Sequence, residues 1–290
     1  MTVRTLSRSQ HYKGWWQKRL SRAIGYTVLI VAGLFLFMPI FWLLVAALKV
    51  DSEFITYPVH WFPAVPQWEN YVKIFTLTNF LPVAGRTAAL AITTTLISTF
   101  VSAMGGFAFS RYQVKGSAQL FFVIIAMMIV PGIVLLIPQF ILYSWLHLTN
   151  TYWPWILGAF GGSSFGIFMF RQFFLSFPKE LEEAAEVDGC GPFRIFWQIF
   201  MPNATPVIAT SIIFGFNGIW GDYLTPSMYL NADKTLLPVV LANSFVNPNG
   251  NPYLTITLAA NVVYILPLII VFFIAQKQIL KGVVTSGLKG

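Results

Sequence analysis

The sequence predicts an all-α membrane protein that crosses the bilayer six times. Of the 290 residues, 57% are hydrophobic and only 10% are charged, a composition that excludes an ordinary soluble domain. Six apolar runs are each long enough to cross about 30 Å of hydrocarbon as a helix. They lie at Ala23–Leu48, Thr87–Ser110, Ala118–Trp145, Tyr152–Phe170, Thr205–Leu230 and Leu254–Gln276.

The distribution of Lys and Arg predicts the orientation of these helices. Of the 18 Lys and Arg residues, only Lys49, Lys73, Arg86 and Lys234 lie on the side of the bilayer opposite to the N-terminus. By the positive-inside rule, both termini and the connection between the fourth and fifth runs face the cytoplasm. The net charge of +8 therefore indicates membrane topology, and we do not expect nucleic-acid binding. The domains we expect are a basic arm at 1–22, a membrane domain at 23–281 and a cytoplasmic tail at 282–290.

The individual runs carry further signals. The first is too long for the apolar region of a signal peptide and no small-residue cleavage site follows it, so we expect it to be retained. The third contains Pro131 and Pro138, seven residues apart, which predicts two kinks on one helix face. Freed carbonyls must face protein or water, so this helix either lines a pathway or is only shaped for packing. In the fourth, Gly158, Gly162 and Gly166 predict close contact with another helix.

The fifth run is the least membrane-like. Asn217, Trp220 and Tyr223 combine amide and aromatic groups, which suit the hydrogen bonding and apolar stacking of a sugar ring. These residues either line a transport pathway or pack helices together. Asp222 nearby is costly in hydrocarbon unless it is paired or hydrated.

The connection between the fourth and fifth runs is acidic and helical in pattern. Pro178-Lys179-Glu180 begins a helix whose first turn carries carboxylates, which complement the helix dipole. Gly189 stands where a left-handed C-cap is expected, and Pro192 can occupy the first position of a second short helix. The segment therefore predicts a helix–turn–helix on the membrane surface.

Sites for chemistry are missing from the sequence pattern. Cys190 is the single cysteine, no Cys/His spacing suits a metal, and no phosphate-binding glycine loop is found. We therefore expect neither an enzyme nor a cofactor on this chain. Two alternatives remain open: a secondary transporter or channel that needs no ATPase, for which only Asp222 and Arg171 could serve as intramembrane relays, and a membrane-embedded enzyme.

The acidic connection carries a family resemblance. Glu183-Ala184-Ala185, then Gly189 after three residues, and Ile199-Phe200-Met201-Pro202 after nine more resemble the EAA signature of permease subunits in ATP-binding-cassette (ABC) importers. Met201 stands for the usual Leu. Trp68-Glu69-Asn70-Tyr71 resembles an element of carbohydrate permeases, and so does the fifth run, where Gly221 replaces an Asn. The Gly-rich ending with Lys289-Gly290 resembles maltose-type permeases, in particular their smaller permease subunit.

The resemblance implies a type I ABC importer permease fold in the cytoplasmic (inner) membrane of a bacterium or archaeon. The implied partners are a second similar permease, an ATPase dimer that holds ATP and Mg, an extracytoplasmic solute-binding protein, and a carbohydrate substrate. Segment 179–202 would act as the coupling helix that contacts the ATPase, and the tail would also reach it. The residues implied for coupling are Glu182, Glu183, Ala184, Ala185, Glu186, Asp188, Gly189 and Pro202, and those for the tail contact are Ser286, Gly287 and Lys289.

Overall fold

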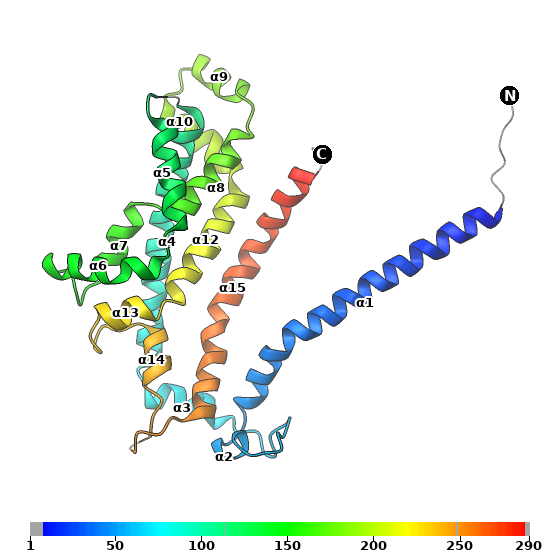
Figure 1. Cartoon of the computed structure of the whole chain (residues 1–290), viewed down its shortest axis with the longest axis vertical. Helices are drawn as coiled ribbons and strands as arrows, with labels where there is room; N and C mark the ends of the chain where they lie inside the picture. The colour runs from blue at the N-terminus through cyan, green and yellow to red at the C-terminus, as the bar shows by residue number, and fades with distance from the viewer. Residues whose placement is uncertain (1–7, 113, 248, 288–290) are drawn as a thin grey trace. The chain divides into compact units, whose positions relative to one another are not determined.

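The computed structural model describes residues 8–112, 114–247 and 249–287, and its regular elements are helices (Figure 1). Within that part of the chain, the one strand-like pairing is an isolated bridge between Val246 and Pro252. The predicted all-α class is therefore confirmed. Two compact units divide the chain: one joins the described residues up to Val72 with Tyr253–Val262, and the other comprises the rest.

The first unit contains α1 (Arg8–Ala46), α2 (Asp51–Phe54) and the start of both α3 (Glu69–Leu77) and α15 (Leu254–Gly287). Side chains fix the short connections between these helices. The Asn70 amide donates to the carbonyls of Ala47 and Lys49 at 3.0 and 2.9 Å. The Asp51 carboxylate accepts from the backbone nitrogen and hydroxyl of Thr255 at 2.8 and 2.7 Å, which satisfies a free donor at the start of α15.

The second unit is built around α4 (Phe80–Arg111), an unbroken helix of 32 residues. Packed against α4 are α7 (Trp153–Phe160), α8 (Ser164–Leu175), α12 (Thr205–Trp220) and α14 (Leu237–Asn243). The remaining elements are α5 (Ser117–Ile129), α6 (Gly132–Trp145), α9 (Glu180–Val187), α10 (Pro192–Ile195), the π-helix η1 (Phe196–Phe200), α11 (Met201–Asn203), α13 (Leu224–Tyr229) and the rest of α15. Figure 1 shows α9 at one end of α4 and α14 near the other.

The third predicted helix is two helices, so the prediction of one helix kinked twice on the same face is wrong. α5 and α6 meet at 101°. Pro131 has no N–H and disfavours helical dihedrals at the residue before it, and Val130 is extended, with φ −72° and ψ 117°. Pro138 alone remains inside a helix, α6.

The fourth predicted helix is also divided, into α7 and α8. Gly162 has a φ of +68°, and the Ser163 hydroxyl caps α8 by accepting from the Gly166 nitrogen at 3.0 Å. A Cβ on Gly166 would lie 2.8 Å from the Ser102 hydroxyl of α4, and one on Gly162 would lie 3.1 Å from it. The predicted close contact is confirmed for these two glycines. Gly158 has nothing within 4 Å in this chain, so its predicted contact with another helix stays a prediction.

The first, second and sixth predicted runs coincide with continuous helices long and apolar enough to cross a membrane: Arg19–Ala46, Phe80–Arg111 and Leu254–Ile279. Two bent pairs satisfy the same test, α5 with α6, and Pro192–Asn203 with Thr205–Trp220 at 81°. The fifth run ends as a helix at Trp220, before the separate α13. The described residues thus contain three such helices, or up to five with the bent pairs, and six crossings stay a prediction.

Candidate functional site

The acidic helix α9 has the first turn and the C-terminal cap that the sequence predicts. Its first turn holds Glu180, Glu182 and Glu183. At its end Gly189 has a φ of +78°, its nitrogen donates to the Glu186 carbonyl at 3.0 Å, and the Cys190 nitrogen donates to the Ala185 carbonyl at 2.9 Å. This pair of bonds is a Schellman motif, which requires a left-handed residue at the glycine position. Pro192 then stands in the first turn of α10, also as predicted.

The two alanines of the Glu-Ala-Ala sequence have different surroundings. Ala184 is exposed, whereas Ala185 is buried in a hydrophobic cluster that we call the aromatic base. Its members are Ala103, Phe107, Phe170, Phe174, Ala185, Ile195, Phe196, Phe200 and Ala204, contributed by α4, α8, α9, α10, η1 and the residue after α11. The rings of Phe107 and Phe200 have centroids 4.8 Å apart. The side of α9 that carries Ala185 is therefore fixed on a tightly packed support.

The outer side of α9 is both acidic and apolar. Val187 is 88% exposed, and Leu181 and Phe193 are exposed as well. Most residues predicted for coupling are exposed: Glu183, Ala184, Glu186, Asp188 and Gly189 in or just after α9, and Pro202 in α11. Glu182 is half-buried, and Ala185 is buried in the aromatic base. Such a surface offers apolar area and negative charge to a partner.

Electrostatics near α9 affect one neighbouring phenol. Tyr112 is the C-cap residue of α4. Burial raises the pKa of Tyr112 above its ordinary value, and the negative charges of Glu182 and Glu186 raise that pKa further. The carboxylates of α9 therefore act electrostatically on the residue that ends α4.

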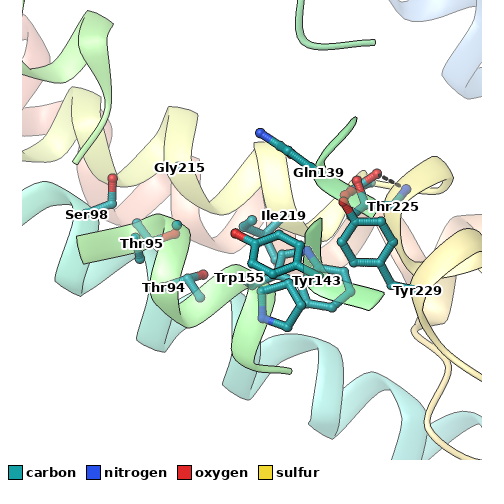
Figure 2. A pocket seen from close by; sticks show the side chains of 14 residues that line it. Thr94, Thr95, Ser98, Gln139, Tyr143, Trp155, Gly215, Ile219, Thr225 and Tyr229 are labelled. Atoms are coloured by element: carbon teal, nitrogen blue, oxygen red, sulfur yellow. Dashed lines mark hydrogen bonds between the residues drawn. The ribbon is translucent and has the colours of Figure 1, made fainter. Parts of the chain in front are cut away.

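A cavity of about 350 Å³ lies in the middle of the second unit, between α4, α6, α7, α12 and α13 (Figure 2). Figure 2 shows hydroxyl groups from α4 along one wall and the rings of Tyr143 and Trp155 beside them. The polar and aromatic residues of its lining are Thr94, Thr95, Ser98, Gln139, Tyr143, Trp155, Asp222, Thr225 and Tyr229. Rings and hydroxyls in one cavity can stack on a ligand and also bond to it.

The aromatic wall of the cavity is held by contacts around Tyr229. The ring centroids of Tyr143 and Trp155 lie 5.9 and 5.6 Å from that of Tyr229. The Asp222 carboxylate accepts from the Thr225 nitrogen at 3.1 Å and so caps the start of α13, as the dashed line in Figure 2 shows. The Asp222 carboxylate is thus partly satisfied by backbone.

A second, smaller cavity of about 130 Å³ continues along the same face of α4. It shares Thr95, Ser98 and Gly215 with the first and adds Thr99. We call Thr94, Thr95, Ser98 and Thr99 the hydroxyl track. The Thr95 side chain lines both cavities, and its hydroxyl is buried without a hydrogen-bond partner among the described residues.

The sequence-predicted pathway residues lie elsewhere. Trp220 is 2% exposed, its indole nitrogen donates to the Tyr264 carbonyl at 3.1 Å, and the Tyr264 hydroxyl donates back to the Trp220 carbonyl at 2.7 Å. This geometry favours the packing alternative, in which Trp220 joins α12 to α15. Asn217, Tyr223, Pro131 and Pro138 are exposed. Neither these four residues nor Trp220 line either cavity.

Comparison with known proteins gives the family. Residues 102–284 match the model of a family described as the binding-protein-dependent transport system inner membrane component. The chain belongs to this family. It is 32% identical to the arabinooligosaccharides transport system permease protein AraQ of Bacillus subtilis (strain 168), over 92% of this chain and 95% of that protein. It is 28% identical to the lactose transport system permease protein LacG of Rhizobium radiobacter, over 93% and 97%.

A solved structure has the same fold as this inner membrane component. It belongs to a bacterial ABC transporter involved in the import of the acidic polysaccharide alginate, and it matches with a TM-score of 0.76 and 22% identity. The match covers 95% of this chain and 99% of that one. As a family member the chain is a transport subunit of the inner membrane and not an enzyme, as predicted.

The predicted tail contact falls at and beyond the end of the described residues. The predicted tail residues Ser286 and Gly287 end α15, where side chains are not described, and Lys289 lies outside the described residues.

The hydroxyl track was not predicted from the sequence. Its signal was present as Thr94, Thr95, Ser98 and Thr99, because residues one turn apart repeat hydroxyls on one face of an otherwise apolar helix.

Proposed function

We propose that this chain is one of two permease subunits in an ABC importer that takes up a neutral carbohydrate. Relatives that align over most of the chain are named for arabinooligosaccharide, lactose and maltodextrin transport. In this proposal the chain crosses the membrane six times, α5 with α6 and α7 with α8 each form a bent crossing, and both termini are cytoplasmic. The charge distribution of the sequence supports that orientation.

The cavity beside the hydroxyl track is the proposed section of the translocation pathway. Hydroxyl groups and the rings of Tyr143 and Trp155 match the two faces of a sugar, polar at its edge and apolar on its ring face. Among the described lining residues, Asp222 is charged and no Lys or Arg is present. A sugar carboxylate would be repelled there, so the lining favours a neutral ligand. This lining is the observation that carries the substrate class.

The helix α9 is the proposed contact with the ATPase. Its outer side carries exposed Val187 and Leu181 among carboxylates, and its inner side is fixed on the aromatic base. ATP and Mg are bound by the ATPase dimer, and closure of that dimer moves α9 together with its base. An extracytoplasmic binding protein delivers the carbohydrate at the opposite membrane face, which the family description supports. The tail residues Ser286, Gly287 and Lys289 are a second proposed ATPase contact.

Purification and reconstitution test this function. The chain is expressed with its neighbouring transport proteins and purified through a tag on this chain alone, and ATP hydrolysis is measured in proteoliposomes against a panel of neutral and acidic sugars. We expect an ATPase to co-purify and a neutral oligosaccharide, presented by a binding protein, to raise hydrolysis. Transport without an ATPase would contradict the proposal, and stimulation by acidic sugars alone would contradict the substrate class.

A further inference from the structure

Arg111, the last residue of α4, lies where four elements of the second unit meet. Its side chain is 5% exposed. One guanidinium nitrogen, Nη2, donates to the carbonyls of Phe174 and Phe177 at 2.8 and 3.1 Å. Phe174 lies in the last turn of α8 and Phe177 lies two residues beyond its end, where the carbonyl end of the helix carries partial negative charge. The guanidinium therefore caps α8 from the end of α4.

The same guanidinium also faces α9 and η1. Its Nε lies 3.6 Å from the Glu182 carboxylate of α9, and its central carbon lies 4.7 Å from the centroid of the Phe200 ring. Nε is buried and has no hydrogen-bond partner among the described residues. Because 3.6 Å is longer than a hydrogen bond, a small shift of α9 toward α4 would complete this contact.

We propose that Arg111 is a positioning residue that makes α9 and α4 move as one body, so that motion imposed on α9 reaches the transport cavity. This inference rests on the proposed function. Ser98 and Arg111 are 13 residues apart on α4, a distance of about 20 Å at about 1.5 Å per residue. No break interrupts α4 over that distance, whereas α5 with α6 and α11 with α12 are sharply bent. A continuous helix whose last residue lies 3.6 Å from Glu182 of α9 and whose middle lines the cavity is a physical connection between the two sites.

The guanidinium has properties here that an apolar side chain of similar volume lacks. It bonds to one carbonyl of α8 and one just beyond that helix, attracts a carboxylate of α9 and lies over a ring of η1 at the same time. Planar, delocalised charge suits such multiple contacts, whereas the point charge of Lys does not reach them all.

The test measures carbohydrate imported per ATP hydrolysed by the complete reconstituted importer. Arg111→Gln should assemble with its partners and keep basal hydrolysis, while import per ATP falls by about tenfold, within the usual range of coupling between sites. Arg111→Lys should restore part of that ratio. Arg171→Gln is the matched control: Arg171 donates to the Phe109 carbonyl at 3.1 Å and lies 4.2 Å from the Phe121 ring, linking α8 to α4 and α5. It should leave the ratio unchanged.

The outcomes separate this inference from the proposed function. If Arg111→Gln does not assemble, Glu182→Gln is compared with Glu183→Gln, which removes an exposed carboxylate of the same turn and keeps the ion pair with Arg111. Import per ATP should fall by about threefold in the Glu182 variant and less in the Glu183 variant; equal ratios would overturn the role of the ion pair. An unchanged ratio in the variant that assembles overturns the role of Arg111 alone. A wild-type importer in which no carbohydrate drives hydrolysis overturns the proposed function, and the role of Arg111 with it.

Discussion

The end of α4 near α9 and the middle of α4 are built from different kinds of side chain. At the end near α9, Ala103 and Phe107 join a base of packed phenylalanine rings. In the middle of α4, Thr94, Thr95 and Ser98 line a cavity. Large rings fill the space between helices and transmit displacement, because a packed interior has low compressibility. Small hydroxyl side chains leave space and offer hydrogen bonds. The difference is one of packing: the end of α4 near α9 is densely filled, whereas its middle leaves space and offers hydroxyl groups.

Gly189→Val should give the largest effect, because it acts at the end of α9, the helix that rests on the aromatic base. A β-branched residue disfavours the left-handed conformation that Gly189 adopts, although nothing within 4 Å of its Cβ position would clash. The end of α9 should therefore rearrange, with uptake reduced by at least about tenfold and ATP hydrolysis no longer raised by carbohydrate. Uptake and hydrolysis are measured together in proteoliposomes.

Gly189→Asn is the matched control for that experiment. Asn adopts the left-handed region more readily than other residues with a side chain, so the Schellman motif can persist. We expect Gly189→Asn to retain most of the uptake. Equal, full coupling in the Val variant would contradict the importance of this cap.

Thr95→Val tests the ligand region. The substitution keeps the side-chain shape and removes a buried hydroxyl that has no partner among the described residues. If that hydroxyl bonds to the carbohydrate, KM for uptake should rise about fivefold, the value of about one hydrogen bond, while basal ATP hydrolysis stays the same.

Thr210→Val is the comparison for Thr95. The Thr210 hydroxyl donates to the Pro206 carbonyl of its own helix at 2.8 Å, away from both cavities. KM should not change in this variant. If the two variants behave alike, the hydroxyl track does not contact the substrate.

The same contrast explains how much could be predicted from the sequence. The α9 segment is contiguous, and its cap, its acidic first turn and the proline of α10 each follow from local rules, so all three were predicted. The cavity is lined by residues from five elements. Which elements meet there depends on the breaks at Val130–Pro131 and at Gly161–Ser163, where the chain bends. Hydropathy indicates membrane-length runs but does not detect where such a run is divided.

The aromatic residues show the same limit in another way. Trp220 has the aromatic side chain expected of a sugar contact, yet its indole nitrogen donates to the Tyr264 carbonyl of α15. Tyr143 and Trp155, which do line the cavity, have no local pattern that separates them from other membrane aromatics. Side-chain type indicates what a residue can bind, and tertiary structure decides what it meets.

Ala185→Val and Ala184→Val form the pair with the smallest expected effect. Both place a β-branched residue in α9, so their cost in helix propensity is shared. Ala185 is buried in the aromatic base, where an added methyl pair should cost about 1–3 kcal/mol through overpacking. The unfolding temperature of the purified importer should therefore fall in the Ala185 variant and stay near wild type in the Ala184 variant. Equal unfolding temperatures in the two variants would contradict the tight packing of the aromatic base around Ala185.

Side-specific labelling of α9 tests the central claim that this helix is cytoplasmic and held by an ATPase. Val187 is 88% exposed at the end of α9, so Val187→Cys in a Cys190→Ser background gives one accessible thiol on the chain. A membrane-impermeant maleimide should label it in inside-out vesicles and not in intact spheroplasts, and co-expressed ATPase should protect it from the reagent. Labelling from outside the cell, or labelling unaffected by the ATPase, would contradict the account.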